Sequence, residues 1–236
     1  MAPTWSRDST RRFTDRPFYT QREIEEAAQT ALRQCAEKAK VSSTWPLPDH
    51  MLHKLVDFLT LRFDPYGDLS HIGIDVDGYT VFSRVEKPSV FINRDLDDPR
   101  YRLRRRMTIA HELGHVVLHQ KLYERDDRQL DLLVPEPLTP VYCAKNQIVR
   151  SVDWCEWQAG FFGGALLMPT NLLVEYIGKF DEKALIGVAA EGFSARRLEV
   201  LVSEEFDVSK EAARVRLSQV GIIKPAPQAR LDEQTA

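Results

Sequence analysis

The sequence predicts an α+β fold: a small antiparallel sheet packs on a helical core with an HExxH motif, and a helix-turn-helix-like cap follows. Three observations lead to it. Apolar residues recur at helical spacing up to about residue 60. A stretch rich in Ile, Val, Phe and Tyr then covers residues 71–93. Several segments with helix start signals fill the chain from there to about residue 224.

Composition narrows the class of protein. The 236 residues are 43% hydrophobic and 28% charged, which is ordinary for a folded protein with a core that needs no disulfides. The net charge of -3 argues against a surface built throughout for nucleic acid. Three cysteines without CxxC spacing fit a reducing compartment. Because no apolar stretch resembles a signal peptide or a membrane span, we expect a cytoplasmic protein with no membrane partner.

The chain divides into four predicted parts. Residues 1–19 are polar and locally basic, which predicts a disordered tail. Residues 20–193 form the main domain, and residues 194–224 form a C-terminal helical subdomain. Residues 225–236 begin with two prolines in three residues and are predicted to be a flexible tail.

Two helices and three strands are expected before residue 94. Thr20 and Glu23 form a capping box at the start of the first helix, and Asp49 is the expected N-cap of the second. Strands are predicted over residues 71–76, 79–85 and 89–93, with Asp77-Gly78 as the turn between the first two.

Helices dominate the rest of the chain. Asp98-Pro99 is a helix start, and that helix should reach about residue 120. Residues 121–153 predict a long loop with at most a short element inside. Another helix should run from about residue 153 to Met168-Pro169. The expected N-caps of four short helices beyond it are Thr170, Asp181, Ser194 and Ser209.

The helix that starts at Asp98-Pro99 carries an HExxH motif, His111-Glu112-Leu113-Gly114-His115. Residues four apart lie about 40° apart around a helix. Both imidazoles can therefore reach one ion at about 2.0–2.1 Å. Glu112 projects beside such an ion, where it can act as the general base. The motif predicts a zinc-type metal site.

The third metal ligand has to come from elsewhere. His119 lies about 6 Å beyond His115 along the helix axis, so it is better interpreted as a core residue or a support for a ligand. Glu156 is the better candidate, because small residues follow it on the same helix face and allow close approach to the neighbouring helix. The alternative is that these glycines break the helix. The small residues are Ala159, Gly160, Gly163 and Gly164.

Two segments resemble the ImmA/IrrE family of metallopeptidases: MTIAHELGHVVLH (107–119) and EWQAGFFGGALLMP (156–169). The similarity spans about residues 20–222. It implies zinc, or alternatively manganese, bound by His111, His115 and Glu156, with Glu112 as the base. It also implies a bacterial or mobile-element origin, and a helix-turn-helix repressor as substrate that is cut to relieve repression. The family has Asn and Ala at the positions of Gly160 and Gly163.

The sequence leaves two features of the reaction open, the oxyanion donor and the place where substrate binds. The oxyanion donor besides the metal is one of His119, Tyr142 and Arg150. Substrate is expected to add as a strand along residues 89–93, which include Phe91 and Asn93, and the alternative is that this strand is covered.

Two clusters of basic residues invite comparison with nucleic-acid binding, but their charge balance favours other roles. Five arginines lie between residues 100 and 106, and a solvated helix face is preferred over an acidic or DNA partner. Residues 194–224 hold six basic and five acidic side chains, a poor balance for phosphate contacts. Direct DNA binding is therefore less favoured than a core or substrate-docking role for these helices.

Three classes of function remain from the sequence. The first is a site-specific peptidase for a repressor. The second is a DNA-binding or regulatory protein with a structural or vestigial metal. The third is an inactive interaction protein that retains the fold. Metal that is lost in His115→Ala would support the first two, and only cleavage of a repressor would single out the first.

Overall fold

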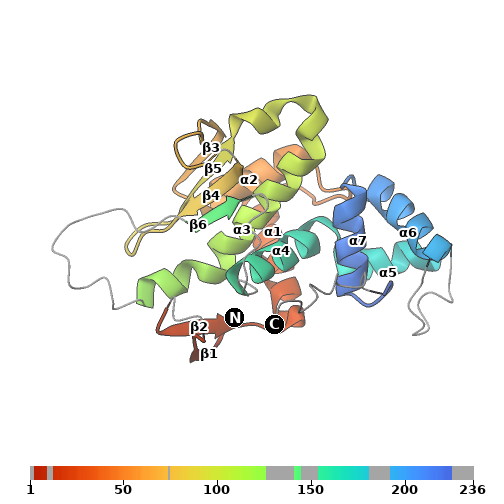
Figure 1. Cartoon of the computed structure of the whole chain (residues 1–236), viewed down its shortest axis with the longest axis horizontal. Helices are drawn as coiled ribbons and strands as arrows, with labels where there is room; N and C mark the ends of the chain where they lie inside the picture. The colour runs from red at the N-terminus through yellow and green to blue at the C-terminus, as the bar shows by residue number, and fades with distance from the viewer. Residues whose placement is uncertain are drawn as a thin grey trace, which may run out of the picture.

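The computed structural model describes residues 3–9, 13–73, 75–125, 141–144, 154–180 and 192–224. Its centre is a pair of packed helices, α3 (Arg102–Arg125) and α4 (Trp154–Leu167). Figure 1 shows the larger sheet beside α3 and the C-terminal helices at the far end of α4. The α+β prediction is confirmed. No helix in the described ranges is both long enough and apolar enough to cross a membrane.

The two N-terminal helices lie against this central pair. Helix α1 (Gln21–Ala39) begins with the predicted capping box, in which Thr20 and Glu23 bond each other's backbone N–H groups. Helix α2 (Asp49–Leu59) has Pro48 rather than Asp49 at its N-cap. Asp49 is the first helical residue, and its carboxylate accepts a bond from the buried Arg106 instead.

The larger sheet has four strands in the order β3-β5-β4-β6. They are β3 (Arg62–Gly67), β4 (Val76–Val81), β5 (Ser89–Asn93) and β6 (Val141–Ala144). Strand β3 runs parallel to β5, and the other pairs are antiparallel, so the sheet is mixed and the antiparallel prediction is wrong. Among the described residues of the strand predicted over 71–76, only Val76 lies in a strand, as the first residue of β4, and the additional strand of the sheet is β3. Strand β6 lies within the predicted long loop.

The predicted Asp77-Gly78 turn is also wrong, because both residues lie inside β4. Val76, Gly78 and Thr80 are buried in alternation along that strand. This face of β4 lies against α3, where a side chain at Gly78 would meet the Thr108 methyl group at 2.9 Å. The glycine serves close packing rather than a turn.

Helix α3 follows two short 3-10 turns, η1 (Arg94–Asp97) and η2 (Pro99–Tyr101). Asp98 caps η2 by accepting a bond from the Arg100 N–H, close to the predicted start. The helix continues to Arg125, five residues beyond the predicted end.

The arginines near the start of α3 are paired within the chain. The predicted solvated face is confirmed for Arg100 and Arg102, which are exposed, and is wrong for Arg106, which is buried. Arg106 is buried and donates to the carbonyls of Leu47 and Asp207 as well as to Asp49. The others also pair with acidic residues, two from the turn just before α3 and two from distant segments, namely Arg100 with Asp98, Arg105 with Asp97, Arg102 with Asp207, and Arg104 with Asp77.

Three further helices complete the described chain: α5 (Thr170–Gly178), α6 (Gly192–Glu205) and α7 (Lys210–Gln219). Ser209 caps α7 as predicted. Pro169, rather than Thr170, is the N-cap of α5, and Ser194 lies inside α6. Helices α6 and α7 pack together, and α7 contacts α4. The expected cap at Asp181 and the predicted tail 225–236 lie outside the described residues.

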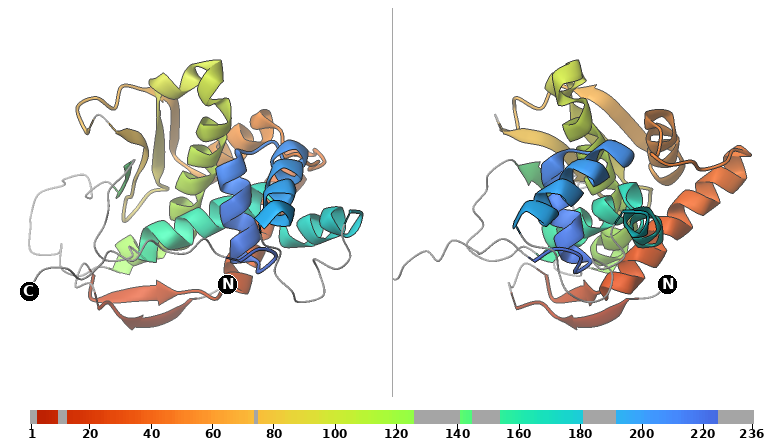
Figure 2. Two further views of the ribbon diagram at one scale, coloured as in Figure 1. Left: turned by 45° about the vertical axis from the view of Figure 1, so that its right-hand side comes forward. Right: turned by 90° about the vertical axis from the view of Figure 1, so that its right-hand side faces the viewer.

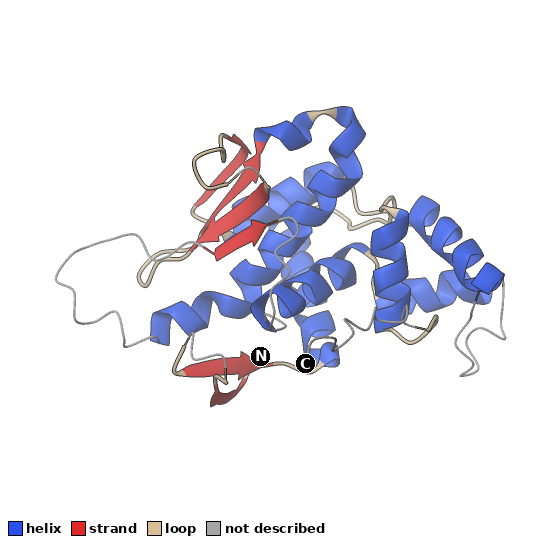
Figure 3. Cartoon of the chain, in the orientation of Figure 1, coloured by secondary structure: helices blue, strands red, loops and turns tan. Residues whose placement is uncertain are grey.

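The predicted disordered tail contains a second sheet, so that prediction is wrong for its described residues. Strands β1 (Thr4–Arg7) and β2 (Asp15–Phe18) pair antiparallel, separate from the larger sheet (Figure 3). Buried Phe13 anchors this hairpin, with its ring 5.4 Å from that of Tyr123 and 6.3 Å from that of Trp154. These apolar contacts supply the burial that the polar composition of the segment concealed.

Candidate metal centre

Small residues bring α3 and α4 into close contact. A Cβ atom at Gly114 of α3 would lie 2.7 Å from the Cα and carbonyl oxygen of Ala159. One at Gly163 of α4 would lie 3.2 Å from the backbone of Ala110 and His111. The predicted close approach is confirmed for Ala159 and Gly163, and α4 is not broken. Gly164 instead faces Arg216 of α7, and sequence reasoning missed the contribution of Gly114 on α3.

Replacement of Gly114 tests this contact. We expect Gly114→Ala to push α3 and α4 apart and to destabilise the protein by about 1–3 kcal/mol, because a methyl group would overlap backbone atoms. Gly160→Ala is the matched control, since a Cβ there meets only the His111 Nδ1 atom at 3.9 Å. Thermal unfolding of both variants provides the measurement. Equal stability of the two would show that the helices adjust without cost.

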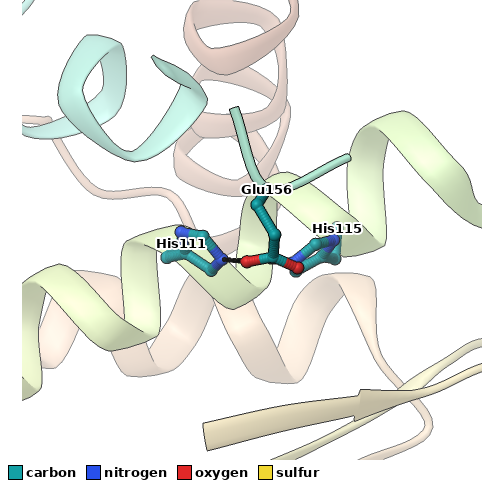
Figure 4. Close-up of side chains that lie close together, drawn as sticks. All are labelled: His111, His115 and Glu156. Atoms are coloured by element: carbon teal, nitrogen blue, oxygen red, sulfur yellow. Dashed lines mark hydrogen bonds and ion pairs between the residues drawn. The ribbon is translucent and has the colours of Figure 1, made fainter. Parts of the chain in front are cut away.

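His111, His115 and Glu156 converge where α3 and α4 meet (Figure 4). The Nε2 atoms of the two histidines are 3.1 Å apart. Glu156 places Oε2 3.0 Å from the His111 Nε2 atom and Oε1 3.3 Å from the His115 Nε2 atom. Tetrahedral ligands about 2.0–2.1 Å from one ion lie about 3.3 Å from each other. The three side chains therefore fit a single small divalent ion.

The charge state of these residues also suits a metal. Burial raises the pKa of Glu156, but the adjacent imidazoles of His111 and His115 lower it by more, so it lies well below its usual range. The carboxylate is therefore ionised. Two imidazoles and a carboxylate form a common donor set for catalytic zinc.

Glu112 lies beside this cluster and is completely buried. Its Oε2 atom accepts a 2.7 Å bond from the Thr80 hydroxyl group on β4. Its Oε1 atom is buried and has no hydrogen-bond partner among the described residues. Burial raises the pKa of Glu112, although the neighbouring imidazoles and Thr80 oppose the rise. One oxygen is thus held in place and the other is left for proton transfer.

Thr80 is a candidate functional residue that the sequence did not reveal. We expect Thr80→Val to keep the shape of the side chain but to lower the rate of peptide cleavage by about 10–100-fold, as is usual for residues that orient a reacting group. Bound zinc should be unchanged. Thr60→Val is the control, because the buried hydroxyl group of Thr60 donates to the Val56 carbonyl on α2, away from the metal site. A wild-type rate for the metal-loaded Thr80 variant would contradict this role.

His119 contacts a proposed ligand rather than joining the cluster. Its Nδ1 atom lies 3.0 Å from the Nδ1 atom of His115, and its Nε2 atom lies 2.9 Å from the Gln158 Oε1 atom. With both ring nitrogens engaged behind His115, its role as an oxyanion donor is disfavoured. The backbone of Tyr142 pairs with Tyr79 on β4, but its side chain and all of Arg150 lie outside the described residues.

The predicted substrate strand is wrong. Phe91 and Asn93 lie on β5, which is paired with β3 on one side and β4 on the other. The Phe91 ring stacks on Tyr79 at 4.7 Å, and the Asn93 amide donates to the Val76 carbonyl. Because both edges of β5 are occupied, it has no free backbone groups to pair with an added strand.

A protein-family model matches the part of the chain that holds this site. The Peptidase M78 family model, described as the IrrE N-terminal-like domain, matches residues 72–218. This segment is well over half of the chain, and it contains both the HExxH helix and Glu156. No curated protein matches the chain.

Proposed function

The chain belongs to the ImmA/IrrE family of metallopeptidases, and from this premise we propose that it is a zinc-dependent endopeptidase that cuts a helix-turn-helix repressor. Cleavage would relieve repression in a stress response or in the induction of a mobile element. The observation that carries the peptidase assignment is the convergence of three ligand atoms beside a buried carboxylate whose Oε1 atom has no described partner.

In this proposal each residue of the site has a separate task. The ion would be held by His111, His115 and Glu156. It would act as a Lewis acid that polarises the peptide carbonyl and makes water more acidic. Glu112 takes the proton of the attacking water on Oε1 and returns it to the leaving amine. Thr80 holds the other oxygen of Glu112 throughout. Manganese is the alternative ion, although two imidazole ligands favour zinc.

The chief alternative is a DNA-binding or regulatory protein with a structural metal. Two observations argue against it. Structural zinc sites have four protein ligands, and only three converge in the described chain. The arginines near the start of α3 pair with acidic residues of the same chain, which offset the positive charge that would attract phosphates.

Purified protein loaded with zinc tests the proposal. It would be incubated with each helix-turn-helix repressor found to be encoded beside its gene, and the products would be identified by mass spectrometry. We expect one cut, which a chelator prevents. An intact repressor after incubation with protein that holds one zinc per chain would contradict the proposal. Salt-dependent binding of duplex DNA by the same sample would favour the alternative.

A further inference from the structure

We propose that a hydrogen-bond chain from the N-terminal hairpin fixes which ring nitrogen of His115 faces the metal. His119 and Gln158 are then positioning residues, and the backbone of Pro17 holds the outer end of the chain. This inference rests on the proposed metal site and deepens it. It concerns three groups that bind no metal themselves.

The hydrogen-bond chain begins at the side-chain amide of Gln158, which is buried near the start of α4. Its Nε2 atom donates a 3.1 Å bond to the Pro17 carbonyl of β2. A carbonyl oxygen only accepts, so this bond sets the orientation of the amide. The amide oxygen of Gln158 must then face His119, whose Nε2 atom is 2.9 Å away.

The next member is His119, which is also buried. Because its Nε2 atom faces an acceptor, that nitrogen carries the proton of the neutral ring. The His119 Nδ1 atom is therefore a lone-pair acceptor. It lies 3.0 Å from the His115 Nδ1 atom, which must donate to it.

The last member is His115, a proposed ligand with no exposed surface. With its proton on Nδ1, its Nε2 atom keeps a lone pair. That atom is the one that faces His111 and Glu156, at 3.1 Å and 3.3 Å. A metal can bind only the unprotonated nitrogen of an imidazole. The hydrogen-bond chain therefore holds His115 in the tautomer that can bind a metal through Nε2.

The hairpin is thereby part of the support of the metal site, although Pro17 lies outside the segment matched by the family model. Figure 2 shows the two hairpin strands running past the ends of α3 and α4. Phe13 anchors the hairpin on Tyr123 of α3 and Trp154 of α4. The same contact places Pro17 beside Gln158.

Ring-nitrogen NMR with ¹⁵N-labelled histidine measures the tautomers directly, in the full chain at pH 8, with and without zinc. We expect His115 to carry its proton on Nδ1 and His119 on Nε2 in both samples. A His119 ring with its proton on Nδ1 would overturn the proposal. This result stands apart from the proposed function, because a chain that cleaved a repressor could still show the other tautomer.

Zinc affinity, measured by competition with a chelating dye, tests the effect on the metal. Gln158→Met removes the acceptor for His119 and should weaken zinc binding by about 10–100-fold. Gln158→Glu restores an acceptor and should bind zinc more tightly than Gln158→Met. Gln120→Met is the control, because its amide donates to the Ser83 carbonyl and touches none of these histidines.

Two outcomes of the affinity measurement would overturn the proposal. One is wild-type zinc affinity in folded Gln158→Met. The other is equal affinity in the Met and Glu variants of Gln158. If Gln158→Met fails to fold, the tautomers of the wild-type protein still decide the matter.

Discussion

Replacement of Glu112 by Gln is expected to lower the rate of repressor cleavage by about 10²–10⁴-fold, the usual contribution of a general base. The amide oxygen of Gln can still accept the Thr80 hydroxyl bond, but an amide cannot take a proton from water. Strand β4 packs so closely on Glu112 that even a Cβ atom added at Gly78 would lie 3.2 Å from the Glu112 Oε1 atom. The replacement therefore has to match the size and shape of Glu. Cleavage rate and zinc content are measured on the same sample, and zinc content should be unchanged.

The control for Glu112 comes from the same helix. Glu124 is exposed and accepts a bond from Gln120, so Glu124→Gln should cleave at the wild-type rate. A zinc-loaded Glu112→Gln protein that cuts the repressor as fast as the wild type would show that another group is the base.

Replacement of Arg216 by Met is expected to reduce the free energy of unfolding by about 3 kcal/mol. Arg216 is completely buried where α7 meets α1 and the end of α4. It donates to the Glu25 carboxylate and to the Met168 carbonyl. Burial lowers the pKa of Arg216, and the pairing with Glu25 opposes that shift. The expected fall in the free energy of unfolding is at the low end of the range for breaking a buried ion pair, because the Glu25 carboxylate keeps a hydrogen bond from Thr170.

Urea unfolding of Arg216→Met measures this loss, and Arg214→Met is the matched control. Arg214 is two residues earlier on α7, more exposed, and paired with Glu211 of its own helix. Its removal should leave stability almost unchanged. Equal losses in the two variants would mean that the buried pair does not hold α7 against the rest of the chain.

Local signals predicted the presence of the helices well, because each signal lies at or near the start of its helix, although the caps expected at Asp49, Thr170 and Ser194 lie inside their helices. The capping box of Thr20 and the N-cap at Ser209 are examples. Strands were harder to predict. Strand β3 contains Asp, Pro and Gly, which disfavour strands, and it pairs in parallel with β5, more than twenty residues later in the chain. Asp77-Gly78 has the composition of a turn, but Gly78 is required by the close contact with α3.

The residues of the candidate site also fall into two groups, those predicted from local sequence and those that depend on distant segments. His111, Glu112 and His115 follow from spacing on one helix, and Glu156 was indicated by the small residues beside it. Thr80 and Gln158 were missed, because what they contact comes from distant segments, 32 residues away for Thr80 and 141 for Gln158. Each of the two is an ordinary polar residue in sequence. Only the packing of β4 and of the hairpin against α3 and α4 gives them a role.

A crystal structure of the zinc-loaded protein, with the ion located by its anomalous scattering, tests the central claim most directly. We expect one ion per chain, bound by the Nε2 atoms of His111 and His115 and by the carboxylate of Glu156, with Glu112 beside it and unbound. An ion bound by His119 in place of Glu156, or located away from these three residues, would contradict the account.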